Sequence, residues 1–189
     1  MPLIVKDFIR SVMGNVKIIL RPSGLSDASL RYHWFNDPEF TRLYLGRPLF
    51  TSYRQVEEEI LFSTYSTLST GLYELAIQTV DTNLYIGNTF FRKMDWQNRS
   101  AEYGIFIGDP EHRGAGIGPD VTRRMLEQGF AEFGFRRIWL TVLAFNEPAI
   151  KCFEKCGFQS EGVLRDAIYS GGQFNHVIIM SVLAGAKSL

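Results

Sequence analysis

The sequence predicts a single domain of the α/β class, with strands and helices of mixed α+β type around one core. Its length of 189 residues suits one ordinary domain and is short for two. Hydrophobic residues make up 46% of the chain and charged residues 21%, which is typical of a globular protein. Strand-like and helix-like segments follow one another without an internal repeat or a linker, so residues 1–189 are taken as the domain.

Strands are predicted where apolar and β-branched residues gather between turn residues. They fall at residues 16–21, 73–80, 84–94, 101–108, 138–143 and 177–183. Asp81, Thr82 and Asn83 separate the second of these segments from the third. Such residues are typical of a hairpin turn, so these two strands are expected to form a hairpin.

Helices are predicted from apolar spacing and from residues that start or stop a helix. They fall at residues 26–36, 52–65, 119–133 and 146–156. Ser52 is a candidate N-cap, and Pro119 stands in a first turn, where its missing N–H costs nothing. Gly134 and Gly157 follow the last turns of two helices. The sequence Asn-Asp-Pro-Glu at 36–39 is interpreted as a turn.

Charge and hydropathy argue against two classes of protein. Lys plus Arg total 20 and Asp plus Glu total 20, whereas a nucleic-acid-binding protein usually carries a basic excess. The arginines at 42, 47, 123 and 124 are therefore weak evidence for such binding. No apolar run approaches the roughly 20 residues that span a bilayer, and residues 1–15 lack the pattern of a signal peptide. We expect a cytoplasmic protein that binds neither nucleic acid nor membrane.

The sequence predicts no metal site. Cys152 and Cys156 lie four residues apart in a helix-like segment, but two ligands do not make a site. His33, His112 and His176 lie far from this pair in the sequence. The cysteines are interpreted as reduced packing residues.

A glycine-rich loop joins a predicted strand to a predicted helix. Gly114, Gly116 and Gly118 leave their backbone N–H groups unshielded by side chains, and the positive end of the helix lies beside them. This combination favours binding of a phosphate group. The spacing differs from that of the dinucleotide fingerprint and of the P-loop. A simple tight turn is the alternative.

This loop carries a resemblance to a known family. Residues 113–118, with the sequence RGAGIG, resemble the Gln/Arg-x-x-Gly-x-Gly/Ala pattern of the GNAT superfamily of acyl-CoA-dependent N-acetyltransferases. The stretches AEYGIFI at 101–107 and FNEPAIKCFEKCGF at 145–158 resemble two further segments of that family. Residues 161–183 resemble the tail of its Rim-like branch, which acts on ribosomal proteins and small amines. The match runs from about Val16 to Leu183, which leaves residues 1–15 as an N-terminal extension.

The resemblance implies a fold and a cofactor site. The implied fold is a mixed, mostly antiparallel sheet of about six to seven strands with about four helices, in which the fourth and fifth strands splay apart. Acetyl-CoA would lie in that gap as cosubstrate, without a metal. Its arm and pyrophosphate would contact Ile105, Phe106, Ile107, Arg113, Gly114, Ala115, Gly116, Ile117, Gly118, Asn146 and Phe153. Asn146 is equally well suited to cap the helix that follows it.

Glu102 is the predicted catalytic residue. Strand alternation places Glu102, Gly104 and Phe106 on one face of their strand, and Tyr103, Ile105 and Ile107 on the other. The resemblance implies that Glu102 is the base that removes a proton from the attacking amine, often through water. Burial would raise the pKa of its carboxyl group to suit that role. The alternative is that Glu102 forms a structural ion pair or lies on an exposed face of the strand.

The sequence lacks the general acid that the resemblance would lead us to expect. Many relatives have tyrosine at the position of Phe153, where it donates a proton to the leaving thiolate, and phenylalanine cannot do so. Tyr103, Tyr169 and Cys152 are nearby candidates in the sequence.

The resemblance predicts an N-acetyltransferase in which a primary amine attacks acetyl-CoA directly in a ternary complex. Trp34, Asp37 and Tyr169 are predicted to bind the amine, although isolated aromatic residues are also common in cores. A peptide N-terminus, a polyamine, an amino sugar or an aminoglycoside would each fit, and the protein would be a monomer or a homodimer. The alternative function is an inactive acyl-CoA-binding sensor or scaffold.

Overall fold

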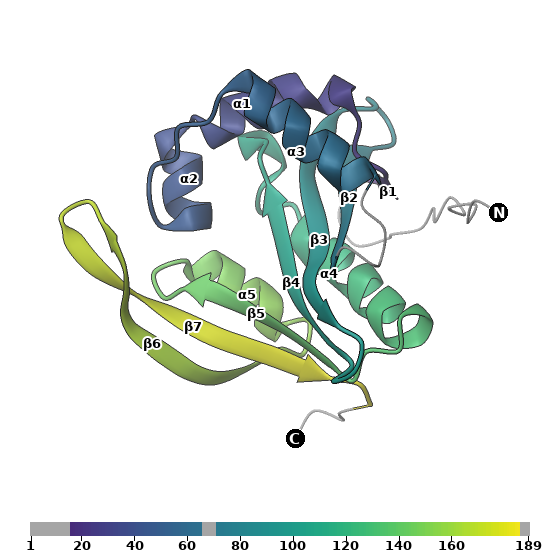
Figure 1. Cartoon of the computed structure of the whole chain (residues 1–189), viewed down its shortest axis with the longest axis vertical. Helices are drawn as coiled ribbons and strands as arrows, with labels where there is room; N and C mark the ends of the chain where they lie inside the picture. The colour runs from purple at the N-terminus through teal and green to yellow at the C-terminus, as the bar shows by residue number, and fades with distance from the viewer. Residues whose placement is uncertain (1–15, 66–70, 186–189) are drawn as a thin grey trace.

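A seven-stranded sheet forms the centre of the protein in the computed structural model, which describes residues 16–65 and 71–185 (Figure 1). The strand order is β1-β2-β3-β4-β5-β7-β6. The strands are β1 (Ile18–Arg21), β2 (Leu72–Thr79), β3 (Tyr85–Asp95), β4 (Ser100–Ile107), β5 (Arg137–Leu143), β6 (Gln159–Ser170) and β7 (Gln173–Leu183). All neighbouring strands are antiparallel except β4 and β5. The mixed, mostly antiparallel sheet is therefore confirmed, and the predicted extension at 1–15 lies outside the described residues.

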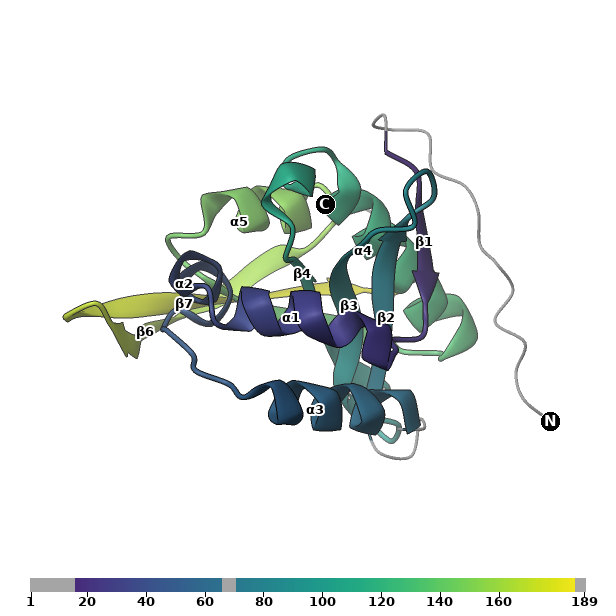
Figure 2. The ribbon, with the colours of Figure 1, turned by 90° about the horizontal axis from the view of Figure 1, so that it is seen from above.

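Helices cover both faces of the sheet. They are α1 (Ala28–Phe35), α2 (Pro38–Leu45), α3 (Tyr53–Tyr65), α4 (Ile117–Glu127) and α5 (Glu147–Glu154). Figure 2 shows α4 and α5 on one face, and α1 and α3 on the other. Val121 and Met125 of α4 are fully buried in the larger core, against sheet residues such as Phe91. Phe35 and Phe40 form a smaller core with Phe106 of β4 on the opposite face.

Helix α2 corrects the prediction of a turn at residues 36–39. Asp37 accepts hydrogen bonds from the backbone N–H groups of Glu39 and Phe40 as N-cap, and Pro38 fills the first helical position. Asp, Pro and Glu in this order also suit the start of a helix, and here the helix forms because Phe40 enters the smaller core. Gly46 ends α2 in the left-handed conformation, with a φ of 72°.

Strand β6 was not predicted from the sequence pattern. It is one of the two edge strands of the sheet, and most of its residues are exposed on both faces. An edge strand without a buried face has no alternation of apolar and polar residues, so the pattern that identifies other strands is missing. Helix α4 also begins at Ile117 rather than Pro119, which places Gly118 inside its first turn. Ser52 caps α3 as expected, because its Oγ accepts a hydrogen bond from Gln55 N.

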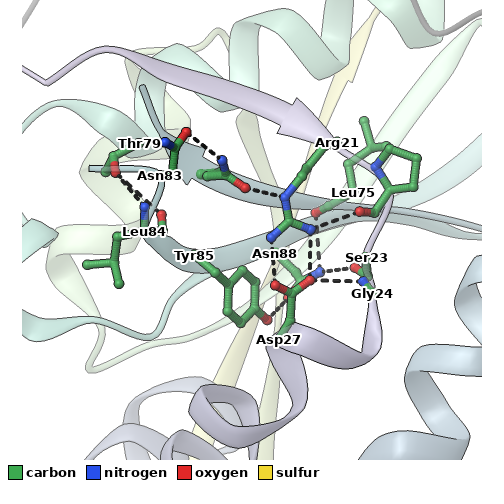
Figure 3. Close-up of polar contacts among 12 residues, drawn as sticks. Arg21, Ser23, Gly24, Asp27, Leu75, Thr79, Asn83, Leu84, Tyr85 and Asn88 are labelled. Atoms are coloured by element: carbon green, nitrogen blue, oxygen red, sulfur yellow. Dashed lines mark hydrogen bonds and ion pairs between the residues drawn. The ribbon is translucent and has the colours of Figure 1, made fainter. Parts of the chain in front are cut away.

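A buried polar network ties β1 and the start of α1 to β2 and β3 (Figure 3). Arg21 forms an ion pair with Asp27 at 2.6 Å, and Asp27 also accepts a hydrogen bond from Gly24 N. Asn88 of β3, which is fully buried, bonds Ser23 Oγ and the hydroxyl of Tyr85. The network gives hydrogen-bond partners to polar groups that become buried where the chain enters the core, and buried polar groups need such partners.

Candidate active site

The central feature of the site is a cleft between β4 and β5. Ser100 to Glu102 of β4 pair with Arg137 to Trp139 of β5, and the pairing of these two strands stops there. Beyond this point the two strands separate, as Figure 1 shows. The predicted splay of the fourth and fifth strands is therefore confirmed. The cleft measures about 850 Å³ and is lined by both strands, α2, the glycine loop and α5. Edge N–H and C=O groups of β4 are thus available to a ligand that extends along the strand.

The glycine loop lies at one end of the cleft. Gly114 and Gly116 have φ values of 78° and 80°, a conformation that side chains disfavour, and both residues line the cleft. Gly118 serves packing as well, because a Cβ there would lie 3.1 Å from Cys152 Sγ. Ile117 is buried in the core, Ala115 packs against that core, and neither residue lines the cleft.

Arg113 stabilises the loop from within. Its Nε and Nη2 donate to the carbonyl oxygens of Ile107 and Gly108, at 2.9 and 2.7 Å. The guanidinium lies 5.7 Å from the centre of the Phe40 ring. The side chain therefore fixes the exit of β4 relative to α2, and it lines the cleft at the same time.

Asn146 and Phe153 line the cleft from α5. Asn146 caps this helix, since its Oδ1 accepts from Ala149 N at 3.3 Å. Its Nδ2 donates to Leu43 O of α2 at 3.1 Å, so one side chain connects two helices across the cleft. Phe153 is 7% exposed and packs edge-on against Tyr103.

Glu102 lies where the two strands part, and its carboxylate is buried between two cations. The carboxylate is 2.5 Å from Arg92 Nη2 and 2.9 Å from Lys93 Nζ. Burial acts to raise the pKa of Glu102, but the hydrogen bonds and charges of Arg92 and Lys93 outweigh it and lower that pKa below its ordinary value. The expected burial-raised pKa is therefore wrong, and the ion-pair alternative describes the carboxylate in this structure.

The three candidates for a general acid occupy different environments. The hydroxyl of Tyr103 bonds Thr89 and Thr122 at 3.3 and 3.0 Å, and burial raises the pKa of this phenol. Tyr169 is 62% exposed on the β6–β7 hairpin, where it contacts Phe174. Cys152 lines the cleft, and its hydrogen bond with the Cys156 thiol, together with burial, raises its pKa and keeps it protonated.

The residues predicted to bind the amine do not line this cleft. Trp34 is 8% exposed and packs against Tyr85 and Phe106 in the smaller core. Asp37 caps α2, and Tyr169 lies on the hairpin described above. Tyr44, which the sequence analysis did not select, lines the cleft instead. Burial raises the pKa of Tyr44 to about 12. The sequence analysis missed Tyr44 because it did not predict α2, the helix that carries this residue.

The sequence of the chain matches a family of known activity. The acetyltransferase (GNAT) domain matches residues 17–159, which is most of the chain. The protein belongs to the GNAT acetyltransferase family. The resemblance seen in the glycine loop is thus confirmed over the strands and helices that form the cleft.

Relatives of this GNAT protein include several N-acetyltransferases. An uncharacterized N-acetyltransferase, p20, of Bacillus licheniformis is 29% identical over 88% of this chain and 93% of its own length. The uncharacterized N-acetyltransferase YoaA of Bacillus subtilis is 31% identical over 82% of this chain and 87% of its own. A spermidine N(1)-acetyltransferase of Vibrio cholerae is 32% identical over 57% of this chain and 61% of its own.

Solved structures share the GNAT fold. The crystal structure of spermidine N-acetyltransferase from Vibrio cholerae, in complex with CoA and spermine, superposes with a TM-score of 0.78. It is 24% identical, and the match covers 88% of this chain and 95% of that one. In the residues that the present structure describes, no helix is long and apolar enough to cross a membrane. The same residues contain no cluster of three or more His, Cys, Asp or Glu suited to a metal ion.

Proposed function

We propose that this protein transfers an acetyl group from acetyl-CoA to a primary amine by direct attack in a ternary complex. The observation that carries the proposal is the cleft, which joins the phosphate-binding geometry of the glycine loop to a buried carboxylate at Glu102. Glu102 and Ile107 are separated by five residues of extended strand, or roughly 17 Å. An elongated cofactor with its phosphates at one end and its reactive group at the other fits such a site.

Residues of this chain that suit acetyl-CoA lie along one wall of the cleft. Ile105, Phe106 and Ile107 offer the unpaired edge of β4 to the pantetheine arm. The backbone amides of the loop and the first turn of α4 face the place proposed for the pyrophosphate. The bound CoA in the Vibrio cholerae enzyme supports this choice of cofactor.

The chemistry needs a neutral amine and a stable leaving group. The amine nitrogen forms a bond to the acetyl carbon, the C–S bond breaks, and the electron pair leaves with sulfur as a thiolate. Glu102 accepts the proton that the amine loses, through water. The neighbouring cations keep this carboxylate ionised and, because they lower its pKa, also make it a weaker base. Since a thiol has a reference pKa of about 8.5, the thiolate leaves without a dedicated acid.

A panel of amines tests the proposal. Release of CoA from acetyl-CoA is measured with peptides, polyamines, amino sugars and aminoglycosides. Turnover with at least one class is expected. Binding of acetyl-CoA without turnover on any amine would instead favour the inactive sensor or scaffold.

Gly116→Val is expected to weaken acetyl-CoA binding at least tenfold while the fold survives. The β-branched side chain would stand where the phosphates approach, in a backbone conformation that valine disfavours. Calorimetry on the folded variant measures the loss. Gly171→Val is the control, because Gly171 also has a positive φ, 60°, but lies in the hairpin turn. Unchanged affinity in a folded Gly116→Val protein would show that the phosphates bind elsewhere.

Phe153→Tyr is expected to change the acetylation rate less than tenfold. Phe153 is packed against Tyr103 and Phe158, so an added hydroxyl would need space and a hydrogen-bond partner in an apolar site. Rates of the two proteins are compared with one substrate from the panel. A silent wild type and an active Phe153→Tyr variant would contradict a mechanism without a dedicated acid.

A further inference from the structure

Two consecutive residues of β3 point their charges at the same carboxylate, which a regular strand does not allow. Arg92 lies opposite Glu102 in the β3–β4 register, so Lys93 would ordinarily face the other side of the sheet. The register shifts between Arg92 and Asp95, and Lys93 has a φ of 50°. This bulge turns Lys93 back, so that Nζ reaches Glu102 and lies 5.4 Å from the centre of the Trp139 ring.

At the end of the cleft away from the glycine loop, the positive charges of Arg92 and Lys93 outnumber the single negative charge of Glu102. One carboxylate faces two cations, so the cluster of Arg92, Lys93 and Glu102 carries a net charge of +1. Glu102 is also the only carboxylate among the described residues that line the cleft. The lining cations are Arg92, Arg113, Lys151 and Lys155.

Arg92 is well placed to bind a further anion. Its side chain is 49% exposed, and its hydrogen bond to Glu102 uses only Nη2 of a group with five N–H donors. The guanidinium lies 5.5 Å from the centre of the Phe90 ring, which limits its orientation. Tyr44 borders the same end of the cleft, and its charge interaction with Arg92 acts on the pKa of both groups. A guanidinium held in this way matches a carboxylate or a phosphate with two parallel hydrogen bonds.

We infer that the acceptor is an amine that carries an anionic group, a carboxylate or a phosphate, near its amino group, and that Arg92 binds that group. The inference rests on the proposed function and narrows its substrate class. A polyamine fits poorly, because each further ammonium group needs a carboxylate partner and would here meet Arg92 and Lys93. The substrate named for the spermidine acetyltransferase relatives is thus not the one this cleft favours.

Matched pairs of amines test the inference with the full-length protein. The pairs are the C-terminal amides of alanyl-aspartate and alanyl-asparagine, and an aminoalkyl phosphate with the corresponding amino alcohol; spermidine is measured beside them. For at least one pair, kcat/KM is expected to be tenfold or more higher for the anionic member, and the favoured pair tells carboxylate from phosphate. The preference should fall as salt is raised, because it arises from charge.

Arg92→Gln is expected to bring the ratio within each pair close to one. Any effect of this substitution on Glu102 changes both members of a pair equally, so the ratio isolates recognition of the anion. Arg92→Lys should keep part of the preference, since it keeps the charge and loses the planar donor pair. Arg54→Gln removes an exposed ion pair with Glu58 on α3 and should leave the ratio unchanged.

Several outcomes would overturn the inference. Spermidine turned over as well as the anionic amines, or an unchanged ratio in Arg92→Gln, would overturn it while the proposed function stands. Equal turnover of the members of both pairs would do the same. Absence of turnover with every amine would overturn the inference and the proposed function together.

Discussion

Glu102→Gln is expected to lower the acetylation rate by roughly 10² or more, the usual scale for the loss of a general base. Glutamine keeps the shape of the side chain and its contacts with Arg92 but cannot take up a proton. The affinity for acetyl-CoA should barely change, because the proposed cofactor contacts lie farther along β4. Steady-state rates and calorimetry on the same preparation separate the two effects.

The low pKa of Glu102 also predicts the pH profile of the wild type. The Glu102 carboxylate has a pKa below the ordinary value of 4.5, because Arg92 and Lys93 stabilise its negative charge. It therefore stays ionised throughout the neutral pH range. The rate should therefore rise with pH as the substrate amine loses its proton, and no limb near neutral pH should come from Glu102. A limb near neutral pH that disappears in Glu102→Gln would contradict the lowered pKa.

Glu161→Gln is the matched control for this substitution. Glu161 also forms an ion pair, with Arg137 at 2.5 Å, and this pair lowers its pKa to about 2. Glu161 is exposed on β6, so its replacement should leave the rate unchanged. If Glu102→Gln retained full activity across the pH range, Glu102 would have a structural role only.

Glu74→Ala is expected to destabilise the protein by about 3–5 kcal/mol, the cost of breaking a buried ion pair by removing one partner. Arg31 of α1 and Glu74 of β2 are 2.7 Å apart, and their side chains are 7% and 6% exposed. Without Glu74, Arg31 would keep only the longer ion pair with Glu59, which is 3.7 Å away and has a side chain more than half exposed. Urea denaturation measures the shift in the unfolding midpoint.

Two further variants show whether burial is the cause. Glu58→Ala breaks an ion pair with Arg54 that is exposed on α3, and its effect should be far smaller. Arg31→Met combined with Glu74→Leu removes both charges and should recover most of the stability lost in Glu74→Ala. Equal losses in Glu74→Ala and Glu58→Ala would contradict the role assigned to burial.

The sequence alone predicted the class of fold and the part of the site that depends on local features. The glycine loop, the cap at Asn146 and the position of Glu102 on its strand follow from residues close together in the chain, and the structure places all of them at the cleft. Backbone conformation and side-chain alternation are properties of a short segment, so a single sequence contains them.

Only the tertiary structure decided what surrounds these residues. It formed α2 by burying Phe40, brought Tyr44 to the cleft, and placed Trp34 in the core instead. The bulge in β3 joined Lys93 to Arg92 at Glu102 and reversed the expected direction of its pKa shift. Strand alternation cannot predict a bulge, and the balance between desolvation and charge depends on which groups from distant segments come together in space.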